Sequence, residues 1–305
     1  MSAWTEAGER SPPRSSGYGR GAGILSVGIG VTGLVTYAYF SLSSHALSAA
    51  DYGAITLLWS AVFVTVSVLY RPVEQLLSRT IADRDARGRS GTGHLRVAAT
   101  IQLALGAAFA AVALALRTPI ENDLLGGSAT LYWVLVVAVL AYAASYFARG
   151  FLAGHRRFGL YGGLVLMESV SRCLFAVAVV VGIASGQAVA ALGIAAAPIV
   201  SLAVVPWALG RRLRARGEPG APARADPAIA LEATEAVEPR AEGLREAEFT
   251  LARGGGFAAS VLVVMVCEQT FLNAGPLLVK ATEGARGTAL AGFVFNVLLI
   301  ARAPL

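Results

Sequence analysis

The sequence predicts an all-α integral membrane protein, a polytopic helix bundle of six helices followed by two helices of a second repeat. Three observations predict this fold class. Of the 305 residues, 56% are hydrophobic and 14% are charged, whereas soluble domains contain about 25% charged residues. Eight apolar stretches approach the ~20 residues that a helix needs to cross a bilayer. The arginines lie almost entirely between these stretches, as in multi-pass membrane proteins.

Composition divides the chain into four parts. Residues 1–20 are polar and are predicted to be a disordered cytoplasmic tail, and 21–210 contain the first six apolar stretches. Residues 211–253 form one long polar segment, interpreted as a cytoplasmic linker. Residues 254–305 contain the first two helices of a second, incomplete bundle, which an even number of preceding helices allows to enter in the same orientation. The predicted helices are 21–42, 54–76, 97–116, 129–148, 161–185, 188–209, 254–279 and 287–304.

The charge of the connections predicts the orientation. Connection 79–96 carries five arginines, whereas 43–53 has no Lys or Arg and contains Asp51, interpreted as a helix N-cap. The connection after the fourth helix contains Arg149, Arg156 and Arg157, and the outer connections contain only Arg117, Lys280 and Arg286. The positive-inside rule therefore predicts a multi-pass protein of the plasma membrane with a cytoplasmic N-terminus.

No catalytic or metal-binding constellation stands out in the sequence. His45, His94 and His155 fall in connections on different sides of the membrane, so they cannot share a metal ion or a triad. Lys280 lacks the glycine that precedes the lysine of a phosphate loop. The sequence thus predicts no enzyme activity, no cofactor and no nucleic-acid partner.

Polar side chains inside the first six predicted helices are candidate site residues, because a charge at the bilayer centre costs at least ~2.5–3.5 kcal/mol. Glu168 and Arg172 are four residues apart and share one helix face. They form either a self-satisfied buried pair or part of a substrate pathway.

The end of the second predicted helix contains a further group of candidates. Arg71, Glu74 and Gln75 surround Pro72. Arg71 either extends to the cytoplasmic interface or is turned with Glu74 into a cavity by a kink at Pro72.

The last two predicted helices contain four candidates, Glu268, Gln269, Asn273 and Asn296. Glu268 has no partner of opposite charge within reach in its own helix, and a lone buried carboxylate can carry a proton. The seventh-helix candidates either contact a coupling ion or substrate, or form interhelical hydrogen bonds. Asn296 is more typical of a structural role.

Three stretches carry a family resemblance: LSAADYG at 47–53, PVEQLLSR at 72–79 and RGFLAGHRRF at 149–158. They resemble the polysaccharide and oligosaccharidyl-lipid flippases of the multidrug/oligosaccharidyl-lipid/polysaccharide exporter superfamily. The resemblance implies two helix bundles around a central cavity that opens alternately to each membrane face. It also implies that Arg71, Glu74, Glu168 and Arg172 line this cavity. Because only two helices follow the linker, the chain resembles a C-terminally truncated member.

The resulting functional prediction is a flippase that moves a lipid-linked saccharide outward without ATP hydrolysis. Its predicted partners are this substrate, a coupling ion (proton or sodium) and membrane lipids. Inward-facing arginines favour an isoprenoid-diphosphate-linked sugar, because Arg pairs well with phosphate oxygens. Three alternatives remain open: an ion-coupled multidrug antiporter using Glu268, a membrane glycosyltransferase or polymerase, and a non-transporting accessory subunit of polysaccharide export.

Overall fold

The protein is a bundle of long helices. A computed structural model describes residues 16–88, 91–216 and 251–301, and within these ranges it contains helices and turns but no strand. The predicted all-α class is confirmed. The long helices are α1 (Ser16–Ala46), α2 (Ala49–Ala86), α3 (Gly93–Ala115), α5 (Ala129–Gly154), α6 (Phe158–Val180), α7 (Gln187–Arg216), α9 (Leu251–Glu283) and α10 (Gly287–Ala301). Short helical turns, α4 (Arg117–Pro119), η1 (Ile120–Leu124) and η2 (Gly284–Arg286), connect some of them.

Six segments of the described chain are long and apolar enough to cross a membrane. The last of them, Ser260–Ala301, contains the described end of α9 together with α10, and the apolar part of α7, Gln187–Ala203, is shorter than the others. The protein is therefore a multi-pass membrane protein.

Helices extend past the predicted domain boundaries. α1 begins at Ser16, inside the predicted tail, α7 continues to Arg216, and α9 starts at Leu251, so both ends of the predicted linker are helical. A helix that leaves the apolar layer keeps its backbone hydrogen bonds, and Arg is a good helix former, so hydropathy alone underestimates its length. The remainder of the tail and linker lies outside the described residues.

α2 is longer than the predicted 54–76 at both ends. Its N-cap is Ser48, whose Oγ accepts a hydrogen bond from the backbone N–H of Asp51 at 3.1 Å and donates to its carboxylate at 2.8 Å. The predicted N-cap role of Asp51 is therefore wrong, because Asp51 is the third residue of a Ser-x-x-Asp capping box. At the other end, buried Leu77 and Ile81 keep the helix packed past the apolar run.

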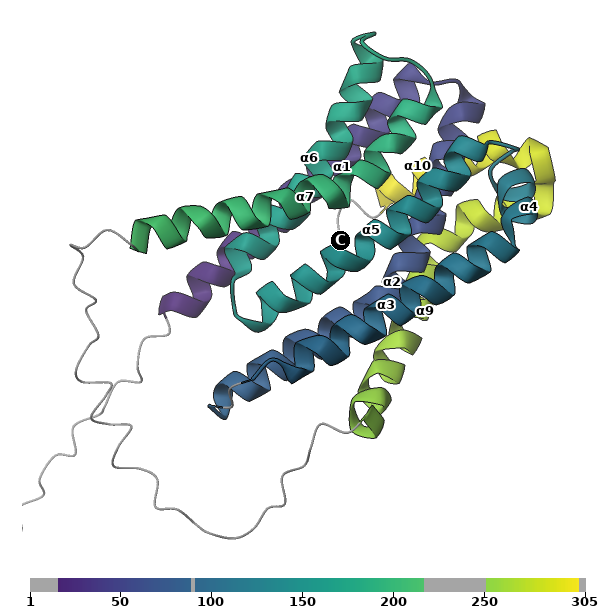
Figure 1. Cartoon of the computed structure of the whole chain (residues 1–305). Helices are drawn as coiled ribbons and strands as arrows, with labels where there is room; N and C mark the ends of the chain where they lie inside the picture. The colour runs from purple at the N-terminus through teal and green to yellow at the C-terminus, as the bar shows by residue number, and fades with distance from the viewer. Residues whose placement is uncertain (1–15, 89–90, 217–250, 302–305) are drawn as a thin grey trace, which may run out of the picture.

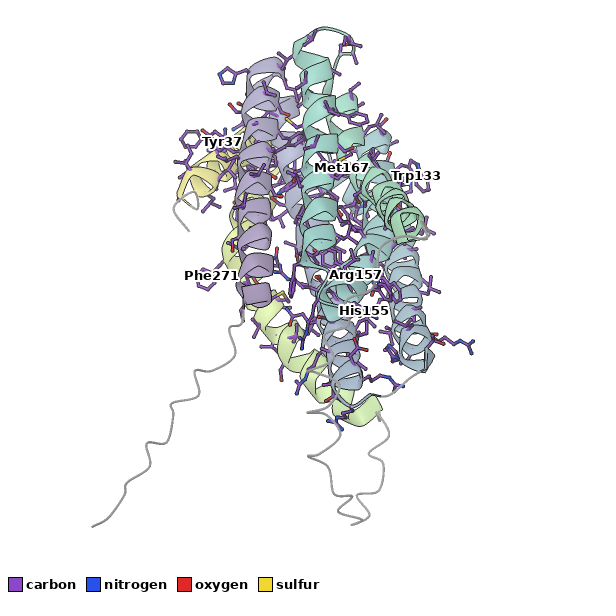
Figure 2. The ribbon with its side chains drawn as sticks, turned by 90° about the vertical axis from the view of Figure 1, so that its left-hand side faces the viewer. Tyr37, Trp133, His155, Arg157, Met167 and Phe271 are labelled. Carbon is purple, nitrogen blue, oxygen red and sulfur yellow. The ribbon has the colours of Figure 1, made fainter. Side chains whose placement is uncertain are left out.

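α2 is the central element of the bundle. It packs against α5, α9 and α10, and to a smaller extent against α3, whereas α1 packs mainly on α6, which in turn packs on α7 (Figure 1). Large apolar side chains such as Tyr37, Trp133 and Phe271 point outward from the ribbon (Figure 2). In a membrane these exposed side chains would contact lipid tails.

Glycines allow two helix pairs to touch at backbone distance. A Cβ atom added at Gly53 of α2 would lie 1.9 Å from the carbonyl oxygen of Thr288 in α10, and one added at Gly292 would lie 3.1 Å from the Cα of Gly53. A Cβ at Gly150 of α5 would lie 2.8 Å from the carbonyl oxygen of Glu74 in α2. Small residues at these crossings set the interhelical distance.

We expect Gly53→Ala to separate α10 from α2, because the added methyl group would overlap backbone atoms that cannot rotate away. Overpacking of this kind costs about 1–3 kcal/mol, so the thermal unfolding temperature in detergent should fall. Gly33→Ala is the matched control, because nothing lies within 4 Å of a Cβ at Gly33. Equal unfolding temperatures for the two variants would contradict the described crossing.

Candidate functional site

A buried ion pair lies inside the bundle between α5 and α6. Arg149 of α5 donates from Nη2 to Oε2 of Glu168 in α6, and their side chains are 12% and 3% exposed. Oε1 of Glu168 accepts from the hydroxyls of Ser145 in α5 and, at 3.4 Å, Ser201 in α7. One carboxylate thus draws three helices together, and both of its oxygens are hydrogen-bonded.

The predicted pairing of Glu168 with Arg172 is wrong. These two side chains form no ion pair within 4.0 Å, because Arg149 of the neighbouring helix occupies the carboxylate. Arg149 itself was assigned to a cytoplasmic connection, whereas the structure places it within α5. Sequence spacing identified both buried charges but not the partner that holds the acid.

Arg172 is held by aromatic rings and hydroxyls. Its guanidinium carbon lies 4.7 Å from the ring centroid of Trp59 in α2. Nη1 donates to the Tyr142 hydroxyl at 2.9 Å, and Nη2 donates to Ser169 Oγ at 3.0 Å, but the buried Nε has no hydrogen-bond partner. A desolvated cation–π contact stabilises by about 2 kcal/mol, so the ring and hydroxyls offset part of the cost of burying this cation.

A groove of about 440 Å³ lies between α1, α2 and the α5–α6 pair. Glu74, which is 8% exposed, lies in its wall and accepts a hydrogen bond from the Tyr161 hydroxyl at 3.1 Å. Gln75 also lines the groove, whereas the half-buried Arg71 does not. The groove is lined by Ile29, Glu74, Gln75, Ser78, Arg79, Ala82, Ala153, Phe158 and Tyr161.

The two predictions for the end of α2 are thus divided. Glu74 and Gln75 face a cavity, as one alternative held, and Arg71 lies outside the lining of that cavity. Glu74 and Arg149 are close enough to interact electrostatically. The groove therefore adjoins the buried charged residues.

The candidates of α9 and α10 form separate contacts. Asn273 Nδ2 donates to Gln269 Oε1 at 2.7 Å within α9, so this bond is not interhelical. Glu268 is partly exposed, and Asn296 accepts a hydrogen bond from the Tyr52 hydroxyl of α2. Among the described residues no hydrogen bond joins these four candidates to Glu168.

Lys280 differs from its predicted place in an outer connection. It lies inside α9, is 6% exposed, and donates to the Thr288 hydroxyl of α10 at 2.9 Å. The helix continues to Glu283 because the lysine finds an oxygen partner on the adjacent helix.

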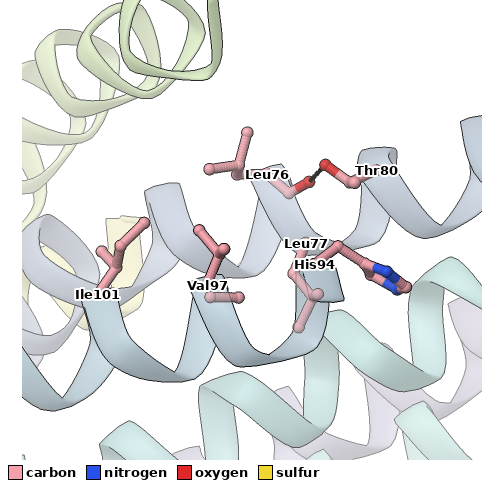
Figure 3. A pocket seen from close by; sticks show the side chains of 7 residues that line it. Leu76, Leu77, Thr80, His94, Val97 and Ile101 are labelled. Carbon is pink, nitrogen blue, oxygen red and sulfur yellow. Dashed lines mark hydrogen bonds between the residues drawn. The ribbon is translucent and has the colours of Figure 1, made fainter. Parts of the chain in front are cut away.

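A second cavity, between α2 and α3, is too small for a ligand. Its volume is about 10 Å³, room for at most one water molecule. Figure 3 shows its mostly apolar wall, with His94 at one end and Thr80 hydrogen-bonded to the Leu76 carbonyl. In the described chain no three His, Cys, Asp or Glu side chains gather closely enough to hold a metal ion.

The residues that the sequence analysis missed lie mainly on one face of α5. Tyr142, Ser145 and Arg149 recur at spacings of three and four, which places them on one side of a helix. Polar side chains at this spacing in an apolar run are the signal that could have identified them. Trp59 and Ser201 carry no comparable local signal.

Comparisons of the chain with protein-family models, with curated proteins and with solved structures find no match.

Replacing Glu168 by Gln removes the charge that three helices share, and it leaves Arg149 without its close partner. Breaking a buried pair from one side costs about 3–5 kcal/mol, so we expect a large fall in thermal stability. The control is Glu121→Gln, which breaks the Arg117–Glu121 pair, where the Arg117 side chain is 49% exposed. Such pairs contribute about 0–1 kcal/mol. Equal losses in thermal unfolding would show that the buried pair has no special role.

Proposed function

We propose that this protein is a flippase-type exporter component that moves a lipid-linked saccharide precursor across the plasma membrane by alternating access, without ATP hydrolysis. The observation that carries the proposal is the buried Arg149, Glu168 and Arg172 group beside a groove in a multi-pass helix bundle. Charges are costly in a membrane interior and mark substrate or ion pathways there.

The chemistry of the group favours an anionic substrate. Two guanidinium groups share one close carboxylate in the interior, so cationic charge exceeds what Glu168 alone can neutralise. Guanidinium forks match the oxygens of phosphate groups. An isoprenoid diphosphate fits this preference, and the groove wall formed by Ile29 and Phe158 gives apolar contact for part of such a lipid.

The orientation that we propose places the N-terminus in the cytoplasm. The connection between α5 and α6 contains the exposed His155, Arg156 and Arg157, two of which are seen in Figure 2. Clusters of arginine are retained on the cytoplasmic side. The groove beside Glu74 then opens toward the side where lipid-linked precursors are made.

The proposal is tested with purified protein in liposomes that contain a fluorescent isoprenoid-diphosphate-linked sugar. Wild-type protein should carry the label across the bilayer, and Arg172→Ala should slow its movement at least tenfold. Arg117→Ala, an exposed arginine outside the group, should leave the rate unchanged. Normal movement by Arg172→Ala at an equal protein level would remove Arg172 from the mechanism, and no movement by the wild type would refute the function.

A second candidate, an ion-coupled multidrug antiporter, is favoured by Glu74. This buried carboxylate faces the groove and has no cation within 4.0 Å among the described residues. A carboxylate in such a place can exchange a proton for a cationic drug.

For the antiporter, we expect a pH gradient to drive dye efflux from liposomes that lack any saccharide lipid. Glu74→Gln should abolish this efflux, because the amide cannot release a proton, and Glu121→Gln should retain it. Efflux that is independent of the pH gradient, or equal in Glu74→Gln, would exclude this candidate.

A further inference from the structure

The structure holds a buried cation and a buried acid that are neighbours but not partners. Arg172 is 4% exposed and Glu168 is 2% exposed, and they are four residues apart on α6. Side chains at this spacing have Cβ atoms about 5–6 Å apart and can reach each other. Yet Glu168 is bonded to Arg149, whereas Arg172 is bonded to neutral hydroxyls and lies over Trp59.

Arg172 retains unused hydrogen-bonding capacity. Its guanidinium has five N–H groups, and the observed bonds involve only one from each terminal nitrogen, while the buried Nε has no partner. A buried donor without a partner costs about 1–3 kcal/mol. A side-chain rotation that brings Glu168 toward Arg172 would remove this cost within one helix, without moving a backbone.

Arg149 would not be left alone by that rotation. It also interacts electrostatically with Glu74 of α2, whose observed hydrogen bond comes from the neutral Tyr161 hydroxyl. Glu74 additionally interacts with Arg71 of its own helix. Two carboxylates and two arginines can therefore pair in two ways: Arg149 with Glu168 as observed, or Arg149 with Glu74 and Arg172 with Glu168.

We propose that Glu168 is a positioning residue that alternates as counter-ion between Arg149 and Arg172. In the observed arrangement Arg172 lacks a carboxylate, and in the other arrangement Arg149 turns toward the groove wall at Glu74. Each exchange thus changes which arginine can receive an anionic group. This last consequence rests on the proposed function, but the exchange itself does not.

The first test uses the sign of a stability change in purified full-length protein. In Arg149→Gln, exchange gives Glu168 a new partner, so adding Glu168→Gln does not raise the unfolding temperature. If Glu168 belongs to Arg149 alone, Arg149→Gln strands the acid, and adding Glu168→Gln raises the unfolding temperature. That result would overturn the proposal. The triple variant is the control, because in Arg149→Gln/Arg172→Gln the acid is stranded in either case and Glu168→Gln must restore stability.

The second test follows Arg172 directly by its contact with Trp59. The chain has four tryptophans, so replacing Trp4, Trp133 and Trp207 by Phe leaves Trp59 as the single reporter. Arg149→Lys keeps the charge but loses the planar fork that grips Glu168, and it preserves folding better than Gln. Exchange then moves Arg172 off the indole, and Trp59 emission should shift in the direction given by Arg172→Gln.

The fluorescence control is Arg117→Lys, because Arg117 lies over Tyr132 and Trp133, not over Trp59. Emission unchanged in Arg149→Lys but shifted in Arg172→Gln would overturn the exchange. Both tests are made without a saccharide substrate. Failure of transport in liposomes would therefore refute the proposed function and leave the exchange to be decided by stability and fluorescence.

Discussion

The ion pair between Arg149 and Glu168 constrains the interior of the bundle more than any apolar contact does. A carboxylate in an apolar medium is tolerated only if its charge is matched and its oxygens are hydrogen-bonded. Here the match comes from α5, and the further bonds come from Ser145 and Ser201. α5, α6 and α7 must therefore pack with these side chains in register. The packing of α1 on α6 depends indirectly on the same requirement.

The second buried arginine shows a different solution to the same electrostatic problem. Arg172 is stabilised by the face of Trp59 and the hydroxyls of Tyr142 and Ser169, which are weaker partners than a carboxylate but cost less to desolvate. Trp59 also stacks on Phe63 with ring centroids 4.0 Å apart. The cation is thereby coupled to the aromatic core between α1, α2 and α5.

Much of the fold follows from the sequence, because hydropathy acts locally. The apolar runs located the helices, and the cost of a buried charge singled out Glu168, Arg172 and Glu74 before any coordinates. Partners were a different matter, since the spacing of Glu168 and Arg172 describes one helix and the bond to Arg149 depends on how two helices pack. The start of α2 was encoded locally at Ser48, but Asp51 was taken for its cap.

The crossing of α2 and α10 at Gly53 and Gly292 has a mechanical consequence. Two backbones touch there with no side chain between them, so rotation of one helix about the other disturbs few contacts at that point. α10 has 15 residues and is about 22 Å long, and its far end sweeps the largest arc. The crossing thus acts as a pivot, and α2, which supports α9 and α10 as well as α5, is the fixed arm against which they would turn.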